Sequence, residues 1–322
     1  MARPQFFRRG PRSRIPSAEK PSSFPEVPPL KRIAILGPGL LGGSIAMAVA
    51  QRAQAASVRV WARSEQRVHQ INALGGGGAE ISVDLGRVLE GAQLVVLAVP
   101  VGVMEALALR VVETGGLADG AVVVDVGSVK GVVEKTVAPV FAEAGIAFVS
   151  SHPMAGSEQT GWAHARADLF EGSVCVLTPS GNETAEAVEC ARVFWRSLGC
   201  ELVQMGVAEH DRAVARISHL PHAAAAALVL AALAEDPSVA RLCGNGFRDS
   251  SRVASGESGM WAEILLENRD EVVGTIDQLR NRLAEVRELL ERGDREKIRR
   301  WLDEARNLRD ASLRGGDWRG GE

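Results

Sequence analysis

Residues 31–50 read KRIAILGPGLLGGSIAMAVA, and this stretch decides the fold of the first half of the chain. Its apolar start over 31–36 predicts a buried strand, and residues 40–52 predict a helix. The G-x-G-x-x-G pattern over 37–42 stands between the two, in the strand-turn-helix context that gives it meaning. Gly37 permits a tight turn, Gly39 lets a pyrophosphate approach the backbone, and Gly42 lets the helix pack on the strand. The stretch therefore predicts a dinucleotide-binding site.

The same alternation of strand and helix continues downstream. Apolar runs at 57–61, 94–99 and 121–126 predict strands, residues 64–74 predict a helix, and the four glycines at 75–78 predict a loop. Strands without polar alternation indicate a parallel sheet that helices cover on both faces. The predicted fold class is therefore α/β, with an N-terminal doubly wound, Rossmann-type domain.

From about Ser180 the pattern becomes almost purely helical, with helices expected over 184–198, 207–235, 257–290 and 294–312. We therefore expect an all-α C-terminal domain and three segments: a disordered extension over 1–30, a dinucleotide-binding domain over 31–180, and a helical substrate and dimerisation domain over 181–322. Apolar stripes on the last helices predict either packing within the chain or the interface of a homodimer, and symmetric dimers are the commonest soluble oligomers. The extension is rich in arginine and proline, and a transit peptide is the alternative interpretation.

Composition excludes several classes of protein. The 322 residues carry a net charge of −3 and are 46% hydrophobic, which is typical of an ordinary globular protein with no basic field for nucleic acid. The longest apolar run, 223–234, is shorter than the roughly 20 residues of a membrane-spanning helix. We expect it to be a buried core helix of a cytoplasmic protein.

The end of the second predicted strand bears on the choice of cofactor. A carboxylate normally binds the ribose 2′-hydroxyl there, but this sequence has Ala62, Arg63 and Ser64. A guanidinium and a hydroxyl suit a 2′-phosphate, which favours NADP modestly; if Arg63 only stacks on adenine, NAD would serve. The full set of expected cofactor-binding residues is Gly37, Gly39, Leu40, Leu41, Gly42, Ala62, Arg63, Ser64, Val99, Pro100, Gly127 and Ser128.

Two further segments follow predicted strands, where ligands bind in open parallel sheets: DVGSVK at 125–130 and SHPMAGSE at 151–158. Together with VLAVP at 96–100, HDRAVARISHLPH at 210–222 and GFRDSSR at 246–252, they resemble the prephenate/arogenate (cyclohexadienyl) dehydrogenase family. The resemblance covers about residues 31–310.

The resemblance implies a reaction of tyrosine biosynthesis, in which a cyclohexadiene acid loses hydride to nicotinamide and a carboxylate as carbon dioxide. A neutral imidazole suits proton removal from the substrate hydroxyl, so His152 is the expected base. The alternative role for His152 is structural, as a cap at the end of a strand. Ser128 could be only a helix N-cap, but the resemblance makes it a second catalytic residue that orients the histidine and the nicotinamide.

The expected substrate site needs a fixed cation for carboxylates, and the resemblance assigns it to Arg252, with Arg248 as the alternative. It also implies that Asp211 supports the pocket. Helical spacing places Asp211, Ser218 and His222 on one face, and Pro221 should kink this helix. The expected substrate-binding set is Arg252, Ser157, Glu158, Asp211, Ser218, His219 and His222.

Competing interpretations are weaker. His210, His219 and His222 are not completed into a recognised zinc set, so no metal is expected. Another two-domain hydroxyacid dehydrogenase should place a lysine base in its second domain, yet no lysine occurs between Lys135 and Lys297. A non-catalytic NAD(P)-sensing protein would keep the fold without the chemistry.

Overall fold

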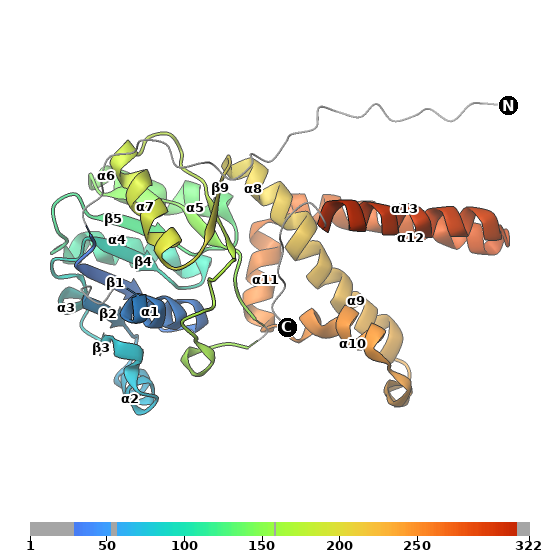
Figure 1. Cartoon of the computed structure of the whole chain (residues 1–322), viewed down its shortest axis with the longest axis horizontal. Helices are drawn as coiled ribbons and strands as arrows, with labels where there is room; N and C mark the ends of the chain where they lie inside the picture. The colour runs from blue at the N-terminus through green and yellow to red at the C-terminus, as the bar shows by residue number, and fades with distance from the viewer. Residues whose placement is uncertain (1–28, 53–56, 158, 314–322) are drawn as a thin grey trace.

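The computed structural model describes residues 29–52, 57–157 and 159–313. A sheet-containing part ends near residue 204, and a helical part follows it and projects away from the sheet (Figure 1). The predicted extension therefore falls almost wholly outside the described residues, and so does Glu158.

A six-stranded sheet organises the first part. Its strand order is β3-β2-β1-β4-β5-β6, and every pair is parallel. The strands are β1 (Arg32–Leu36), β2 (Ser57–Trp61), β3 (Glu80–Ser82), β4 (Leu94–Leu97), β5 (Val122–Asp125) and β6 (Ala147–Val149). All residues of β4 and β5 are buried, which explains their lack of polar alternation. The doubly wound, Rossmann-type prediction is confirmed.

Helices cover both faces of this sheet and build one hydrophobic core on each. The first core lies under α1 (Leu40–Arg52) and α7 (Ala185–Ser197), and the second under α3 (Leu85–Leu89), α4 (Met104–Thr114) and α6 (Ala138–Glu143). The remaining elements are α2 (Glu65–Ala73), α5 (Lys130–Thr136) and the 3₁₀ turns η1 (Gly76–Gly78), η2 (Val101–Val103) and η3 (Trp162–His164). Gly75–Gly78 all have positive φ, which only glycine adopts readily.

A second, smaller sheet was not expected. Its order is β7-β8-β9, from β7 (Ser151–Pro153), β8 (Val174–Leu177) and β9 (Glu201–Gln204); β7 is antiparallel to β8, and β8 is parallel to β9. Phe194 and Trp195 of α7 are buried in the core of the first part. The boundary expected at 180/181 is therefore about 25 residues too early, because α7 and β9 complete the first part rather than open the second.

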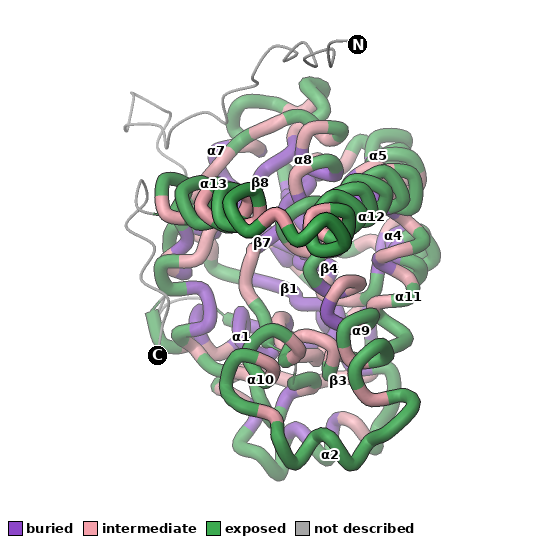
Figure 2. The backbone as a smooth tube through the Cα atoms, turned by 90° about the vertical axis from the view of Figure 1, so that its right-hand side faces the viewer, coloured by how far each residue is buried: buried purple, intermediate pink, exposed green. Residues whose placement is uncertain are grey.

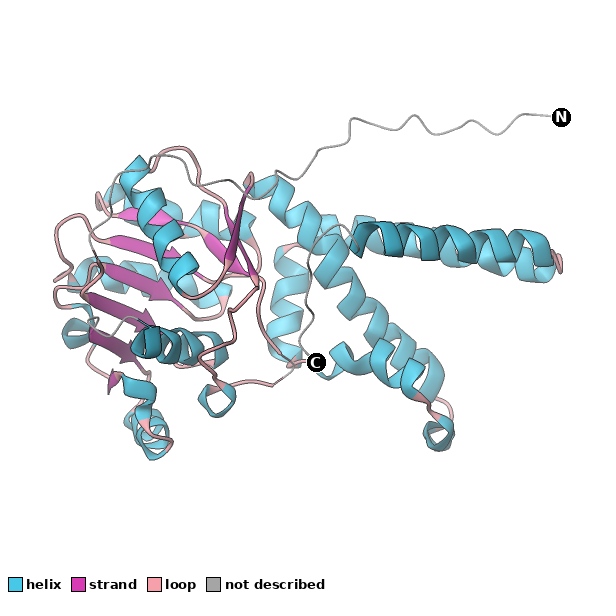
Figure 3. Cartoon of the chain, viewed as in Figure 1, coloured by secondary structure: helices cyan, strands magenta, loops and turns pink. Residues whose placement is uncertain are grey.

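The helical part begins with one long helix in three segments: α8 (Val207–Val214), the π-helical turn η4 (Ala215–His219) and α9 (Leu220–Leu233). It continues through η5 (Pro237–Leu242), α10 (Asn245–Ser251), η6 (Arg252–Ser255) and α11 (Ser258–Glu267). The helices α12 (Arg269–Glu291) and α13 (Arg295–Leu313) form a hairpin that projects from the body (Figures 1 and 3). The helical prediction is confirmed, although the expected helix over 257–290 is divided at Asn268.

Burial differs sharply between the two parts (Figure 2). Within α9 only His222 and Ala225 are buried, and α13 has no buried residue. The expectation of a buried core helix at 223–234 is wrong for a single chain, because nothing in the described chain covers most of its apolar surface. The continuous helix Val207–Leu233 is long and apolar enough, by length and composition alone, to cross a membrane. It also carries buried His210, Asp211 and His219, and it packs against the sheet-containing part through α5.

Candidate active site

The strands of the large sheet point their carboxyl ends toward the helical part (Figure 3). Two contacts join the parts at this edge. The backbone nitrogen of Gly102, after β4, donates to the Glu263 carboxylate of α11. The backbone nitrogens of Lys130 and Gly131, after β5, donate to the Asp211 carboxylate of α8. The ends of the strands and the first helices of the second part therefore meet at one edge of the large sheet, which is where ligands bind in open parallel sheets.

The glycine turn between β1 and α1 leaves room at one position only. A Cβ atom at Gly37, where φ is 121°, would lie 2.3 Å from the Ala98 carbonyl oxygen, and one at Gly42 would lie 2.0 Å from the Gly37 oxygen. A Cβ atom at Gly39 would meet nothing within 4 Å. The outer two glycines are thus required by packing, whereas Gly39 presents open backbone beside the half-buried Leu40 and Leu41. This geometry fits a dinucleotide pyrophosphate at the N-terminus of α1.

The other expected cofactor residues lie at the same sheet edge. Ala62 is buried, while Arg63 and Ser64 are exposed at the end of β2. The Ser64 hydroxyl caps α2 by accepting from the backbone nitrogen of Arg67. The Arg67 guanidinium lies 3.4 Å from the Pro38 carbonyl oxygen of the glycine turn. Sequence reasoning missed Arg67, which comes from the first turn of α2.

The remaining cofactor candidates follow the ends of β4 and β5. A Cβ atom on Gly37 would lie 2.8 Å from Val99 Cγ1, and Pro100 is exposed beside it. Gly127 is buried, and its nitrogen donates to the Asp125 carboxylate over 2.9 Å. Ser128 is half-buried and is not the N-cap of α5, because Val129 occupies that position. The purely structural interpretation of Ser128 as a helix N-cap is therefore wrong.

Lys130, to which the sequence pattern gave no role, is fully buried next to the expected base. Its Nζ lies 2.5 Å from Asp125 Oδ2 and donates to the Ser151 carbonyl oxygen over 2.7 Å. Asp125 Oδ1 accepts from the Ser151 nitrogen over 2.9 Å. This buried, hydrogen-bonded ion pair links β5 to β7, the strand that carries His152.

His152 lies within β7 and pairs with Val176 of β8. We expected it at the end of a parallel strand; instead, β6 ends at Val149 and the chain passes directly into the second sheet. The side chain is 8% exposed. Burial, followed by the nearby His210 and Lys130, holds the pKa of His152 well below its usual value. The imidazole is therefore neutral near pH 7, which is the form that a general base requires.

A second histidine contacts the first. His152 Nδ1 lies 2.9 Å from His210 Nε2, and His210 Nδ1 lies 2.8 Å from Asp211 Oδ1. Burial alone would raise the pKa of Asp211, but hydrogen bonds from His210 and from the Lys130 and Gly131 nitrogens together lower it. The chain of contacts from β7 to α8 thus ends on an ionised carboxylate.

His219 and His222 lie further along the same long helix. His219 Nδ1 lies 3.1 Å from the Asn268 side-chain nitrogen, and burial lowers the pKa of His219 to about 4. His222 stacks on Trp261, with ring centroids 3.6 Å apart, and its buried Nδ1 has no hydrogen-bond partner in the described chain. Both rings are neutral polar groups that could donate or accept at the edge of the site.

The π-helical turn changes the expected face of this helix. Pro221 cannot donate a backbone hydrogen bond, and the preceding residues 215–219 take the wider turn. His219 and His222 are buried together with Asp211, whereas Ser218 is only half-buried. The seven-residue spacing from Asp211 to Ser218 therefore no longer marks one face, because the π turn inserts one residue.

Other expected substrate residues lie nearer the surface. Arg252 is exposed at the start of η6, which packs along α9. A Cβ atom at Gly256, just after η6, would lie 2.9 Å from His222 Cε1, so this segment adjoins the histidine. Arg248 is exposed on α10, and Ser157 is exposed with its hydroxyl bonded to the Gln159 backbone. Glu158 lies outside the described residues.

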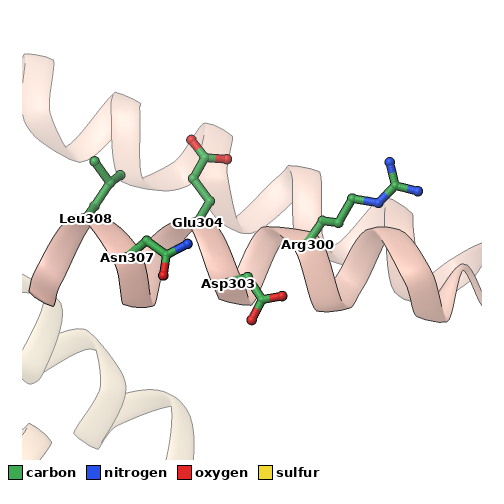
Figure 4. A pocket seen from close by; sticks show the side chains of 5 residues that line it. All are labelled: Arg300, Asp303, Glu304, Asn307 and Leu308. Carbon is green, nitrogen blue, oxygen red and sulfur yellow. The ribbon is translucent and has the colours of Figure 1, made fainter. Parts of the chain in front are cut away.

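Two other kinds of site receive little support. Within residues 29–52, 57–157 and 159–313, no group of three His, Cys, Asp or Glu residues is placed to hold a metal ion. A pocket lies along α13 (Figure 4). All of its lining residues come from this one helix: Arg300, Asp303, Glu304, Asn307 and Leu308. It lacks opposing walls, so it is not a candidate active site.

Comparisons with known proteins agree with this geometry. Residues 47–204 match the family described as "Prephenate dehydrogenase, nucleotide-binding domain", and residues 207–304 match "Prephenate dehydrogenase, dimerization domain". The chain belongs to the prephenate dehydrogenase family. The boundary between the two matches coincides with the end of β9, as the packing of α7 and β9 requires.

Curated relatives match most of the chain. A prephenate dehydrogenase of Bacillus subtilis is 32% identical over 86% of this chain and 75% of its own length. A cyclohexadienyl dehydrogenase of Zymomonas mobilis is 32% identical over 80% of this chain and 87% of its own length. Membership of this family makes the chain a nicotinamide-dependent oxidoreductase of tyrosine biosynthesis.

Solved structures show the same two-part architecture. Prephenate dehydrogenase from A. aeolicus, in complex with hydroxyphenyl propionate and NAD+, has a TM-score of 0.76 at 27% identity, covering 87% of this chain and 97% of that one. Synechocystis arogenate dehydrogenase has a TM-score of 0.72 at 26% identity, covering 87% of this chain and 99% of that one. The resemblance seen in the motifs therefore extends over the fold of both parts.

Proposed function

We propose that this enzyme oxidatively decarboxylates prephenate, arogenate or both, with hydride transfer to NAD(P)+, giving 4-hydroxyphenylpyruvate or tyrosine. The observation that carries the proposal is a buried, neutral His152 on β7, which adjoins the large sheet whose glycine turn fits a dinucleotide, in a chain of this family. The nicotinamide, when bound, accepts the hydride from substrate C4. The aromatic product then makes loss of carbon dioxide favourable.

His152 is the proposed general base. As the substrate C4 hydroxyl becomes a carbonyl, its O–H bond breaks and the proton binds to the imidazole. A neutral, desolvated ring can take this proton without first losing one of its own. Ser128, half-buried after β5, would orient the histidine and the nicotinamide.

Substrate binding is assigned to the helical part. Arg252 would pair with a substrate carboxylate, for which a guanidinium offers two parallel hydrogen bonds. His219, His222 and Ser218 would contact the substrate side chain, and Ser157 and Glu158 would lie at the mouth of the pocket. Support comes from the packing of η6 beside His222 and from the burial of both histidine rings. Asp211 acts through His210 rather than on the substrate.

NADP is the modestly favoured cofactor. The end of β2 carries Arg63 and no carboxylate, and Arg67 adds a second guanidinium near the glycine turn. Two cations suit a 2′-phosphate dianion better than a neutral hydroxyl. The residues proposed to bind the cofactor are those expected from the sequence, with Arg67 added.

We also propose that the enzyme is cytoplasmic and forms a homodimer through its helical part.

A two-by-two assay tests the proposal. Purified enzyme is offered prephenate or arogenate with NAD+ or NADP+, and reduction of the cofactor is followed at its absorbance. Activity in at least one combination is expected, with NADP+ the better cofactor. No reduction in any of the four, by protein that is folded and binds cofactor, would favour a non-catalytic NAD(P)-sensing role instead.

A further inference from the structure

His210 forms the middle of a buried chain of three side chains that crosses from the sheet part to the helical part. His152 Nδ1 lies 2.9 Å from His210 Nε2, and His210 Nδ1 lies 2.8 Å from Asp211 Oδ1. His210 is 0% exposed, and His152 and Asp211 are 8% exposed each. Solvent therefore cannot substitute for a missing partner in this chain.

The positions of the protons follow from the carboxylate end. Asp211 accepts backbone N–H groups from Lys130 over 2.9 Å and from Gly131 over 2.8 Å. Its carboxylate is the acceptor in both bonds, so the contact with His210 requires a proton on His210 Nδ1. A neutral His210 ring then has its lone pair on Nε2, and this atom faces His152.

This arrangement of protons also determines the tautomer of His152. His210 Nε2 can only accept, so the proton of neutral His152 must lie on Nδ1. The other ring nitrogen of His152, Nε2, is left with the lone pair. Without a partner at Nδ1, histidine would be free to carry its proton on either nitrogen, and one of the two forms cannot act as a base through Nε2.

We propose that His210, held by Asp211, is a positioning residue that fixes the proton of His152 on Nδ1 and leaves Nε2 to take the proton from the substrate hydroxyl. The inference rests on the proposed function for the identity of the base. It also gives the domain boundary a role, because the base lies on β7 and the residues that set its tautomer lie on α8. The reactive form of His152 thus depends on the docking of the two parts.

The direct test is the ¹⁵N spectrum of histidine-labelled enzyme without substrate. The chain has six histidines, and His152→Asn and His210→Asn spectra assign the two rings. In the wild type, both rings are expected to show a protonated Nδ1 and an unprotonated Nε2. A wild-type His152 protonated on Nε2 would overturn the proposal, and this result needs neither substrate nor a stable variant.

Two variants separate the two contacts of His210. His210→Asn keeps a donor near Asp211 but loses the acceptor for His152, and kcat is expected to fall about 100-fold with substrate KM and cofactor Kd nearly unchanged. His210→Gln keeps an oxygen near the Nε2 position, and kcat should stay within roughly 10-fold of the wild type. In the ¹⁵N spectrum of His210→Asn, the His152 proton should move toward Nε2.

Exposed His164 supplies the control, and His164→Asn should leave kcat unchanged. Equal kcat for wild type and folded His210→Asn would contradict a positioning role, as would equal losses in His210→Asn and His210→Gln. The spectrum keeps this outcome separate from the proposed function. If neither prephenate nor arogenate reacts, the function fails while the tautomer result stands; if the enzyme turns over and His152 carries its proton on Nε2, only the inference fails.

Discussion

The sheet part and the helical part of this enzyme bury their apolar side chains in different ways. Both hydrophobic cores of the described chain are built from residues between 30 and 202. The helical part instead exposes large apolar side chains, among them Leu230 at 67% and Leu266 at 71%. The first part therefore buries its core within one chain, whereas the second leaves large apolar side chains uncovered, as expected for the homodimer proposed above.

The proposed active site joins the two kinds of structure. The sheet part supplies a rigid edge with the glycine turn, the buried Lys130–Asp125 pair and His152. The helical part supplies the residues that set the state of the base and those proposed to bind the substrate. Substitutions in the two parts should consequently fail in different ways, and this difference can be measured.

The largest effect is expected at the base. His152→Asn should lower kcat by about 10²- to 10⁴-fold, because the base is lost, while cofactor Kd changes little. Steady-state kinetics and cofactor titration by fluorescence measure the two quantities. Exposed His69 is the matched control, and His69→Asn should behave as the wild type. Unchanged turnover in His152→Asn would remove this residue from the mechanism.

The next effect concerns the stability of the sheet part. Lys130→Met leaves the Asp125 carboxylate buried without its cation, so the free energy of unfolding should fall by about 3–5 kcal/mol. Arg300→Met removes an exposed cation of α13 and should change it by less than about 0.5 kcal/mol. Urea denaturation compares the two variants. Similar losses for both would contradict the contrast between a closed core and an open helical hairpin.

Substrate affinity should depend on the helical part. Arg252→Ala should raise substrate KM by roughly 10- to 100-fold with the protein still folded. The reason is that it removes a charge-assisted hydrogen bond, which contributes about 1.5–3 kcal/mol. Arg248→Ala is the control, because this exposed arginine lies on α10 and is the alternative carboxylate ligand. If KM rises in the Arg248 variant and not in the Arg252 variant, the carboxylate contact must be reassigned.

Association should depend on the exposed face of α9. Leu230→Asp places a charge on a side chain that is 67% exposed in one chain, so a dimer that buries it should dissociate more easily. Analytical ultracentrifugation over a range of concentrations measures the shift. The same change at exposed Leu74, in the sheet part, should leave the oligomeric state unchanged. A wild-type monomer at all concentrations would exclude this use of the surface.

The smallest effect is a pH dependence at the junction of the two parts. Burial, and then Glu263, raise the pKa of Glu267 from its ordinary 4.5 to about 7. The folded form holds this proton more tightly than the unfolded form, so the group's contribution to stability is complete below about pH 4.5 and is lost as pH rises through about 7. Glu267→Gln should remove this loss.

The difference in Tm between Glu267→Gln and the wild type should therefore grow from pH 5 to pH 8. The comparison of variant with wild type is needed because His219 acts in the opposite direction: its lowered pKa, about 4, makes stability increase as pH rises from about 4 to 6.5. A Tm difference that is constant with pH would show that Glu267 does not hold an extra proton in the folded enzyme.

Sequence patterns correctly predicted those helices and strands that are determined by residues close together in the sequence. The expected bounds of α1, 40–52, and of β2, 57–61, agree with the structure because a glycine turn and a short apolar run define them. The second sheet was missed, since β7, β8 and β9 have only three or four residues each and gain their identity by pairing. The domain boundary was misplaced for the same reason.

The same distinction between local patterns and long-range contacts applies to the candidate site. Motifs predicted His152 as the base and the glycine turn as a cofactor site, because the proposed chemistry and the observed packing call for these residue types. They could not identify the role proposed for His210, because it depends on a contact with His152, which lies 58 positions earlier in the sequence. Lys130 belongs to the DVGSVK motif, but the sequence gives no role for it. The structure shows that it is buried and forms an ion pair with Asp125.

Hydride transfer and decarboxylation are proposed to occur on one substrate in this enzyme. Reduced cofactor and released carbon dioxide can be followed together during turnover of the preferred substrate. We expect one carbon dioxide for each reduced cofactor, with both rates falling together in His152→Asn. Reduced cofactor without carbon dioxide would contradict it and would indicate an ordinary hydroxyacid dehydrogenase.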